Sequence, residues 1–373
     1  MAGEKYENGI VVFDEKIVYA GAEKDFPGID EIIDAKGMIV MPGLIDAHCH
    51  VGMFEDSMGF EGDDGNEDTD PVTPQLRAID GINPFDRAFS DAVKAGVTTV
   101  VTGPGSANPV GVQFAAIKTH GNCVDDMIIK APCAMKMALG ENPKSVYNEK
   151  SQAPATRMGT MALIRELFME AKEYKEKLDK YDGENNEKPD FDIKLDAMLS
   201  VLRREIPVKI HAHRADDICT AIRIGKEFDV DVTIEHCTDG DRIADVLERE
   251  KLPVNLGPTF GDRSKIELKN MGYGTYKNLS ERGLSVAIIT DHPEITIENL
   301  PFCAVMAVKH GMDAHMALEA ITINAAKNCR IENRVGSLEA GKDADIAVFT
   351  APPTDFNAEC VMTFINGNCV YKR

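Results

Sequence analysis

The sequence predicts a (β/α)8 barrel with a small β domain built from both ends of the chain. From about residue 43 to residue 330, short apolar segments alternate with helix-like ones, the pattern of repeated β–α units around a parallel sheet. This span suits a barrel, whose usual size is about 250 residues. Both chain ends are rich in strand-like segments, so we expect them to meet in one unit. A doubly wound open sheet is the alternative, but no Gly-x-Gly-x-x-Gly motif follows the first strand.

The β domain is expected to take residues 1–42 and 334–373, and the barrel to take residues 43–333. Short, mostly apolar runs predict strands at residues 10–13, 17–20, 346–349, 360–365 and 370–371, with a turn at Asn366-Gly367. A further strand pair is expected within residues 32–41, around Lys36 and Gly37.

The barrel elements follow from the same patterns. Strands are expected at residues 44–47, 98–102, 135–139, 208–212, 232–235, 254–256 and 285–290, and helices at 86–95, 157–179, 216–227, 242–249 and 313–326. Residues 103–113 are Gly-rich but lack a Gly-Lys-Ser/Thr ending, so we interpret them as a barrel loop. Residues 55–70 form an acidic loop that either covers the site or is simply solvated, and residues 170–192 are expected to be a charged surface excursion.

Composition limits the classes of partner. A net charge of -21 opposes nonspecific binding to nucleic acid or to an anionic membrane, so a small-molecule substrate is expected. No apolar run of about 18 residues and no leader-like N-terminus is present, and nine scattered cysteines fit a reducing compartment. We therefore expect a cytoplasmic protein, for which a homo-oligomer is one arrangement that the sequence allows.

Metal-ligand residue types stand at the ends of several expected strands. Side chains alternate along a strand, so His48 and His50 project to one side. His211 and His213 repeat this His-x-His spacing, while His236 and Asp291 end two further strands. The C-terminal ends of barrel strands converge on one face, so His48, His50, His211, His236 and Asp291 are expected to ring one pocket and to hold a divalent metal.

These residue types explain a hydrolytic chemistry. A metal held by neutral imidazoles and a carboxylate, with one position open, lowers the pKa of a bound water to about 7 and polarises a carbonyl. A carboxylate beside the metal can take the proton of that water and hand it to the leaving nitrogen. Asp291 is the candidate for this shuttle, and His236 is the second catalytic candidate.

Several motifs, taken in order, resemble the amidohydrolase superfamily, and most closely its imidazolonepropionase-like and prolidase-like metal-dependent hydrolases. The motifs are Pro-Gly-Leu-Ile-Asp-Ala-His-Cys-His at 42–50, His211, Ile-Glu-His at 234–236, Thr-Asp-His at 290–292, Ala-Ala-Lys at 325–327 and Gly-Ser-Leu-Glu-Ala-Gly-Lys-Asp-Ala-Asp-Ile at 336–346. The resemblance implies a metal-bearing (β/α)8 barrel with a flanking β-sandwich made from both chain ends. It also implies that His48 and His50 from the first strand, His211 from the fifth, His236 from the sixth and Asp291 from the eighth bind metal.

Departures from the family pattern leave the number of ions open. Two-metal members carry a carboxylated lysine at the fourth strand, for which Lys136 ranks first and Lys130 third. Glu141 ranks second, because other members use a glutamate as an additional ligand. One or two ions are expected, with zinc favoured over manganese, iron or nickel.

Other departures concern the substrate and the N-terminus. Arg214 stands where the imidazolonepropionase pattern has an acidic residue, which weakens the specific imidazolone reaction. His213 and Arg214 would meet a substrate carboxylate or carbonyl, or Arg214 would pair with Asp216 or Asp217 at a helix start. Asn108 is a further substrate-binding candidate. The strand that precedes the first hairpin in the family is missing, so the start is expected to be truncated.

The function expected from the sequence is hydrolysis of a C–N bond in a linear or cyclic amide, dipeptides included. A deaminase of an amino-substituted heterocycle needs the same metal and water but a different pocket. A catalytically silent barrel that serves as a scaffold is the alternative from a different class, although a scaffold has no need for five converging ligand residues.

Overall fold

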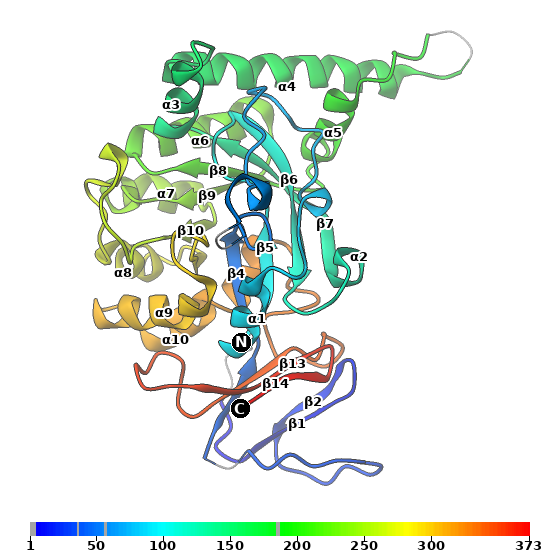
Figure 1. Ribbon diagram of the computed structural model, residues 1–373, viewed down its shortest axis with the longest axis vertical. Coiled ribbons are helices and arrows are strands. Elements are labelled where there is room, and N and C mark those ends of the chain that lie inside the picture. Colours follow the sequence, from blue (N-terminus) through cyan, green and yellow to red (C-terminus); the bar gives the residue numbers. More distant parts are fainter. Residues whose placement is uncertain (1–4, 36, 56–57, 184–186) are drawn as a thin grey trace.

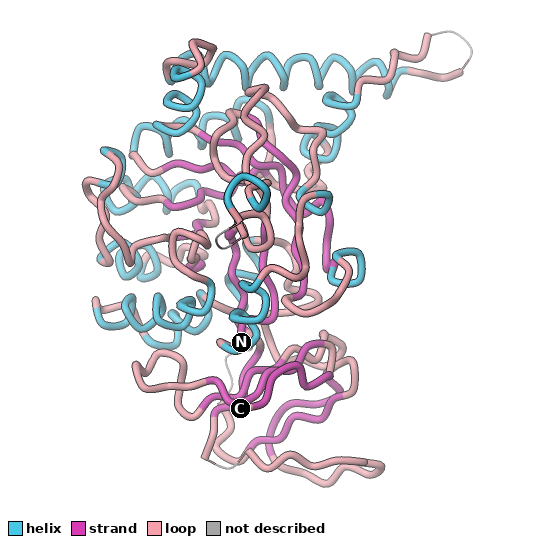
Figure 2. The backbone as a smooth tube through the Cα atoms, in the orientation of Figure 1, coloured by secondary structure: helices cyan, strands magenta, loops and turns pink. Residues whose placement is uncertain are grey.

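The computed structural model describes residues 5–35, 37–55, 58–183 and 187–373. An eight-stranded sheet surrounded by helices forms the larger unit, and two small sheets formed by the chain ends lie below it (Figure 1). Strands are concentrated at the centre of the larger unit and in the lower unit, and helices lie on the outside of the larger one (Figure 2). The fold is therefore the expected barrel with a flanking β unit.

The barrel sheet runs in sequence order from β4 to β11. Its strands are β4 (Leu44–Cys49), β5 (Val97–Thr102), β6 (Val110–Lys118), β7 (Ile128–Ala138), β8 (Val208–Ala212), β9 (Val232–His236), β10 (Val254–Leu256) and β11 (Val286–Ile288). Two backbone hydrogen bonds join the first strand to the segment after the last: Asp291 donates to the His48 carbonyl at 3.2 Å, and His50 donates to the His292 carbonyl at 2.9 Å. The sheet is thus nearly closed.

Some of the helices begin directly after a capping side chain. Asp86, Thr156, Asp192 and Asp313 each accept a hydrogen bond from a backbone N–H of the first turn that follows. The helices are α1 (Arg87–Lys94), α2 (Val124–Met127), α3 (Glu141–Glu149), α4 (Arg157–Lys180), α5 (Ile193–Leu202), α6 (Ala215–Phe228), α7 (Ala244–Glu250), α8 (Gly274–Glu281), α9 (Leu300–Lys309), α10 (Ala314–Ala320) and α11 (Ile323–Asn328). Short 3-10 helices are η1 (Gly59–Gly62), η2 (Ala78–Asp80), η3 (Gly240–Ile243), η4 (Ile266–Leu268) and η5 (Ile297–Asn299).

The expectation of a fully parallel barrel is wrong at β6. This strand pairs antiparallel with both β5 and β7, and it includes part of the segment that we interpreted as a loop. The connections on either side, residues 103–109 and 119–127, are shorter than the dozen or more residues that a parallel crossover needs. Neighbouring strands joined so closely have to run in opposite directions.

Two smaller expectations also need correction. The helix expected over residues 313–326 is two helices, because the backbone of Thr322 leaves the helical region at φ -138°. Within residues 32–41, only β3 (Ile39–Pro42) forms a strand, and Lys36 lies outside the described residues. Ile32 is 85% exposed and Ile33 is 43% exposed, so neither side chain is buried against the sheet.

The flanking unit consists of a hairpin and a four-stranded sheet. Strands β1 (Gly9–Phe13) and β2 (Ile17–Ala22) form the hairpin, and the sheet has the order β14 (Asn368–Lys372), β13 (Cys360–Ile365), β12 (Ile346–Phe349), β3. Ile17 of the hairpin shares an apolar core with Ile346 and Phe364 of the sheet. Both residues of the expected Asn366-Gly367 turn have positive φ, as a tight hairpin turn requires. The division at residues 42/43 and 333/334 stays a proposal.

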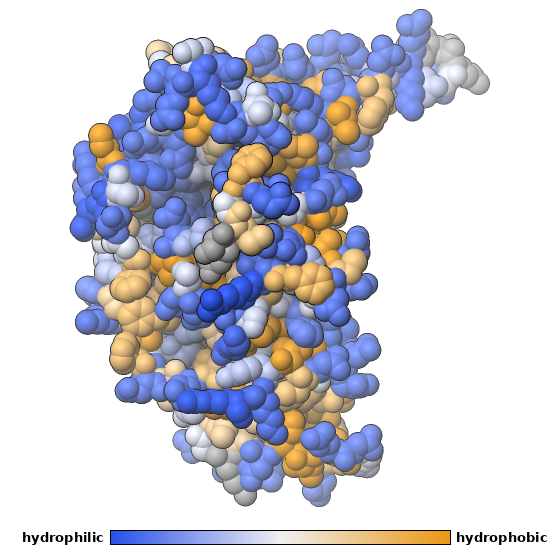
Figure 3. Space-filling view, in the orientation of Figure 1, coloured by the Kyte–Doolittle hydropathy of each residue, from blue (hydrophilic) through white to orange (hydrophobic). Residues whose placement is uncertain are grey.

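The face shown in Figure 3 is mostly hydrophilic, with scattered apolar residues. The C-terminal part of α4 projects from the barrel in Figure 1, as expected for the charged excursion at 170–192, of which residues 184–186 lie outside the described part of the chain. None of the helices among the described residues is long and apolar enough to cross a membrane.

Candidate metal centre

The strand ends bring six ligand-type side chains together in two groups. His48, His50 and Asp291 place one ligand atom each within 4.8 Å of one another, and His211, His213 and His236 do the same. They come from the C-terminal ends of β4, β8 and β9, or from just after β4, β8 and β11. All five residues expected to ring the pocket are therefore at one face of the barrel, and His213 joins them.

The first group holds acceptor atoms face to face. Nδ1 of His50 lies 2.8 Å from the Gly103 carbonyl, which can only accept, so this nitrogen donates and Nε2 keeps its lone pair in the neutral ring. That Nε2 lies 3.2 Å from Oδ1 of Asp291, and Nε2 of His48 lies 3.4 Å from the same oxygen. Lone pairs facing a carboxylate oxygen at these distances need a cation or a proton between them.

The second group contains buried nitrogens without a partner. Nδ1 of His236 donates to the Gly257 carbonyl at 2.8 Å, which leaves Nε2 buried and unpartnered. Both ring nitrogens of His211 are buried without a partner, and Nδ1 of His213 lies 2.7 Å from the Thr238 hydroxyl. Burying unpartnered polar atoms is costly, so this donor set fits a metal ion.

The protonation states also fit metal binding. Burial lowers the pKa of His211 and of His236 well below the usual range of histidine. Burial is also the main cause that lowers the pKa of His213 to about 4. These three imidazoles are therefore neutral at physiological pH, the form in which histidine binds a metal.

The backbone is left-handed at two of the strand ends. φ is 72° at His236 and 55° at Asp291, a conformation that costs a non-glycine residue about 1–3 kcal/mol. The left-handed backbone at His236 changes the direction of its side chain. Glu235 and His236 are consecutive, and yet both side chains approach the His48 ring. Regular strand alternation would send one of them to the other face.

Lys136 is the lysine that lies in the site. It is buried on β7, and its Nζ lies 3.2 Å from Nε2 of His48. Burial is the main cause that lowers its pKa to about 8. Lys130 stands six residues earlier on the same strand, which places it about 20 Å away along the strand.

Glu141 begins α3 and reaches the site through its backbone N–H, which donates to Glu267 at 3.0 Å.

Comparison with known proteins assigns the family. A model of the amidohydrolase family matches residues 39–370. The chain belongs to this family. An amidohydrolase from Thermotoga maritima superposes with a TM-score of 0.94 at 42% identity, covering 97% of this chain and 95% of that one. The motifs that suggested the resemblance are thus confirmed as those of an amidohydrolase.

Two curated relatives are more distant. Amidohydrolase TasK of Hapsidospora irregularis is 28% identical over 91% of this chain, which spans only 37% of the length of that relative. Imidazolonepropionase of Streptomyces coelicolor is 23% identical, and the match covers 92% of this chain and 85% of the relative.

Two carboxylates of this amidohydrolase were missed in the sequence. Oε2 of Glu235 lies 3.0 Å from Nδ1 of His48 and 3.0 Å from Nζ of Lys209, all of them buried. Burial raises the pKa of Glu235, but Lys209 and His48 outweigh it and hold that pKa well below its usual range. Glu267 belongs to η4, where no strand pattern pointed to it. The Ile-Glu-His motif did contain Glu235, but regular strand alternation would place its side chain on the face opposite to His236.

Two of the expected substrate-binding residues are engaged elsewhere. Arg214 makes a bidentate ion pair with Asp216 at 2.9 and 2.8 Å, the alternative that the sequence left open. Asn108 donates to the Glu67 carbonyl and to Thr73, and it accepts from the Tyr147 hydroxyl. In the structure these two side chains therefore serve local contacts, and His213 remains at the centre.

The acidic segment lies against the site of the amidohydrolase. Residues 56 and 57 of the segment 55–70 are outside the described part of the chain. Gly65 and Asn66 bond to the backbone N–H groups of Gly105 and Ala107 at 2.7 and 3.1 Å, so the segment packs on the loop after β5. The neighbouring Phe54 ring lies 5.6 Å from that of His50.

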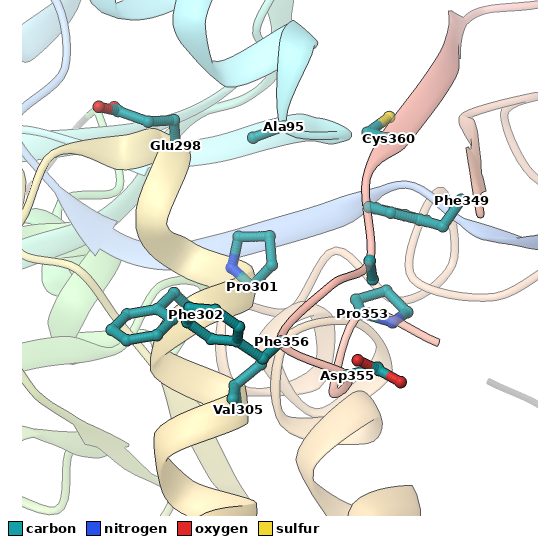
Figure 4. Close-up of a pocket in the computed structure, with 11 residues that line it drawn as sticks. Ala95, Glu298, Pro301, Phe302, Val305, Phe349, Pro353, Asp355, Phe356 and Cys360 are labelled. Carbon is teal, nitrogen blue, oxygen red and sulfur yellow. The ribbon is translucent and has the colours of Figure 1, made fainter. Parts of the chain in front are cut away.

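A separate hollow lies away from the histidines. It has a volume of about 170 Å³ and lies between α9 and the segment that follows β12 (Figure 4). Phe302 and Phe356 line it together with the carboxylates of Glu298 and Asp355. It contains none of the ligand groups described above, so we assign the chemistry to the strand ends.

Proposed function

We propose that this amidohydrolase hydrolyses a C–N bond of a small linear or cyclic amide with a metal-activated water. The observation that carries the proposal is the convergence of buried, unpartnered ligand atoms at the strand ends, namely Nε2 of His236, both ring nitrogens of His211 and Oδ1 of Asp291. Neutral imidazoles together with a carboxylate are the ligand set that catalytic zinc prefers.

His48, His50 and Asp291 would hold one ion, and His211 and His236 would hold a second, with Lys136 placed near the first group. The ion, when bound, polarises the amide carbonyl and acidifies water. Glu235 fixes the His48 ring from the side opposite to Asp291, because its carboxylate lies against Nδ1 while Nε2 faces the site.

Asp291 moves the proton in the proposed reaction. Burial raises its pKa, but the neighbouring imidazoles of His236, His48 and His50 outweigh burial and hold the pKa well below the usual range. The carboxylate is thus available to accept a proton from water at Oδ1 or Oδ2 and to pass it to the leaving nitrogen. The water oxygen first bonds to the carbonyl carbon, and the C–N bond then breaks as the nitrogen takes the proton from Asp291 and leaves as an amine.

We also propose zinc as the metal and the cytoplasm as the compartment. Manganese, iron and nickel are the alternatives that metal analysis would separate. All nine cysteines are free, which supports a reducing compartment.

The test is metal analysis of the purified protein combined with a substrate panel. The panel contains lactams and cyclic ureides, N-acyl amino acids, dipeptides and amino-substituted heterocycles. The expected result is at least one zinc per chain and conversion of an amide to a carboxylate and an amine. Ammonia release from the heterocycles alone would favour a deaminase, while absence of metal and of activity after reconstitution would favour a scaffold.

A further inference from the structure

Glu267 reaches the second histidine group from the long connection between β10 and α8. Its carboxylate is almost completely buried, with a side-chain exposure of 1%. Oε1 lies 3.6 Å from Nε2 of His211 and 3.8 Å from Nε2 of His213. This oxygen has no hydrogen-bond partner, whereas Oε2 accepts the backbone N–H of Glu141 at 3.0 Å.

Local contacts hold this carboxylate in place. A Cβ atom at Gly140, where φ is +84°, would lie 2.8 Å from Oε2 of Glu267, so a glycine is needed for the approach. Two residues before Glu267, Nζ of Lys265 donates to Asn142 at 3.0 Å. Asn142 in turn donates to Ser106 in the loop after β5 at 2.6 Å. The connection after β10 is therefore tied to the start of α3.

The distances match ligands that share an ion. Oε1 lies 3.6 Å from Nε2 of His211 and 3.8 Å from Nε2 of His213. Both distances are longer than a hydrogen bond, whose upper limit is about 3.2 Å. Ligand atoms that lie about 2.0–2.2 Å from a tetrahedral zinc ion are roughly 3.4 Å apart from one another. A buried carboxylate oxygen that faces imidazoles without a hydrogen bond needs a positive charge beside it.

We propose that Glu267 and His213 are further ligands of the second ion, which His211 and His236 also hold. The inference rests on the proposed metal-dependent function. It gives each His-x-His pair one carboxylate, since Asp291 serves His48 and His50 while Glu267 serves His211 and His213. It also assigns a role to His213, which then binds metal through Nε2 while Thr238 fixes its Nδ1.

The experiment compares metal binding by the parent with that by Glu267→Gln. The substitution keeps the size of the side chain and an acceptor for the Glu141 N–H, but it removes the charge. Metal per chain is measured after dialysis against a weak chelator, zinc affinity is measured by chelator competition, and the absorption spectrum is recorded after cobalt substitution. We expect loss of about one ion per chain, or a zinc affinity at the second site that is lower by at least about 100-fold, together with a changed cobalt spectrum.

Glu149→Gln is the matched control, because Glu149 is an exposed glutamate at the end of α3. It should keep the metal content and the cobalt spectrum of the parent. His213→Gln is the second variant, since it leaves the connection after β10 unchanged and should weaken the same ion. Melting curves of the metal-free forms report whether each variant folds.

The outcomes separate this inference from the proposed function. A parent that binds metal and hydrolyses amides, with Glu267→Gln unchanged in metal content, affinity and cobalt spectrum, would overturn the ligand role of Glu267 alone. A rise in KM for an ammonium-bearing amide at unchanged metal content would instead make Glu267 a substrate contact, and it would also overturn the ligand role. A parent that binds no metal would overturn both proposals.

Discussion

Asp291 is the residue on which the proposed chemistry depends most. It belongs to the first ligand group, its Oδ1 is buried without a hydrogen-bond partner, and its backbone is left-handed. Its side chain is 14% exposed, while that of His48 is fully buried. Within this pair, Asp291 is therefore the residue that solvent can reach. In the proposed reaction the Asp291 carboxylate therefore both binds the metal and transfers the proton.

Asp291→Asn should lower kcat by about 10²–10⁴-fold, the contribution typical of a positioned acid–base group. The amide cannot take the proton, and it is also a weaker ligand. Steady-state kinetics on the substrate found in the panel measure the effect, and the melting temperature checks the fold. The exposed Asp126 provides the control variant Asp126→Asn. An unchanged kcat in Asp291→Asn would refute the assigned role.

Lys136→Met tests whether the lysine bridges two ions. With its pKa lowered to about 8 by burial, part of the Lys136 amine is neutral near neutral pH and free to form a carbamate. If it does so, the variant should lose metal, measured as ions per chain, because the bridge is gone. Lys130→Met, on the same strand but far from His48, is the control. An unaltered metal count in Lys136→Met would remove Lys136 from the ligand set.

At the scale of elements, the turn between β7 and α3 makes room for the Glu267 carboxylate beside the second histidine group. Gly140 ends this corner with φ +84° and ψ -139°, a conformation that suits glycine. It lets the carboxylates of Asp217 and Glu267 approach the start of α3. The neighbouring Asp217 is held by a bidentate ion pair with Arg157 at 2.8 and 2.9 Å.

Gly140→Ala should destabilise the protein by about 1–3 kcal/mol, because the new Cβ is strained at this φ and lies 2.8 Å from Oε2 of Glu267. Chemical denaturation measures the change in the free energy of unfolding. Gly274→Ala is the control, since nothing lies within 4 Å of its Cβ position and the change should stay within about 0.5 kcal/mol. Equal stability of the two variants would contradict the strain argument.

At the scale of the whole molecule, a buried charge cluster joins the barrel to the sheet of the chain ends. Nζ of Lys118, at the end of β6, lies 2.8 Å from Asp343 and 2.5 Å from Asp345, just before β12. Arg334 and Lys16 also pair with Asp343. The side chains of Lys118, Asp343 and Asp345 are at most 4% exposed.

Lys118→Met should lower the free energy of unfolding by about 3–5 kcal/mol, because it leaves Asp345 buried without a cation. Lys94→Met removes an exposed ion pair with Asp91 and should change it by less than about 1 kcal/mol. Urea unfolding at pH 7 compares the two variants. A loss in Lys118→Met as small as that in Lys94→Met would show that the cluster does not hold the units together.

The pH dependence of stability is a second measure of this cluster. Burial raises the pKa of Asp343, but Lys118, Lys16 and Arg334 outweigh burial and lower it to about 2, below the usual 3.8. The stabilisation is therefore complete above about pH 4 and is lost as the pH falls toward about 2. In Lys118→Met the pKa of Asp343 lies closer to its unfolded value, so the slope of unfolding free energy against pH between these limits should be shallower than in the parent.

The sequence by itself determined the periodic features of this protein. Strand alternation and the convergence of barrel strands were enough to bring His48, His50, His211, His236 and Asp291 to one face, because both rules depend on local spacing. The turn at Asn366-Gly367 was readable for the same reason, since its chemistry is contained in two residues.

Tertiary structure decided what depends on contacts between distant segments. Apolar patterns mark where strands lie but not the direction in which they pair, so the antiparallel β6 is seen only in the folded chain. In the same way, only the structure decides that Arg214 pairs with Asp216. Glu267 comes from an irregular connection, and Glu235 reaches His48 beside a left-handed His236. The repeat of apolar residues along a strand or helix does not predict such positions. They depend on the conformation of loops and on charged groups that come together only in the folded chain.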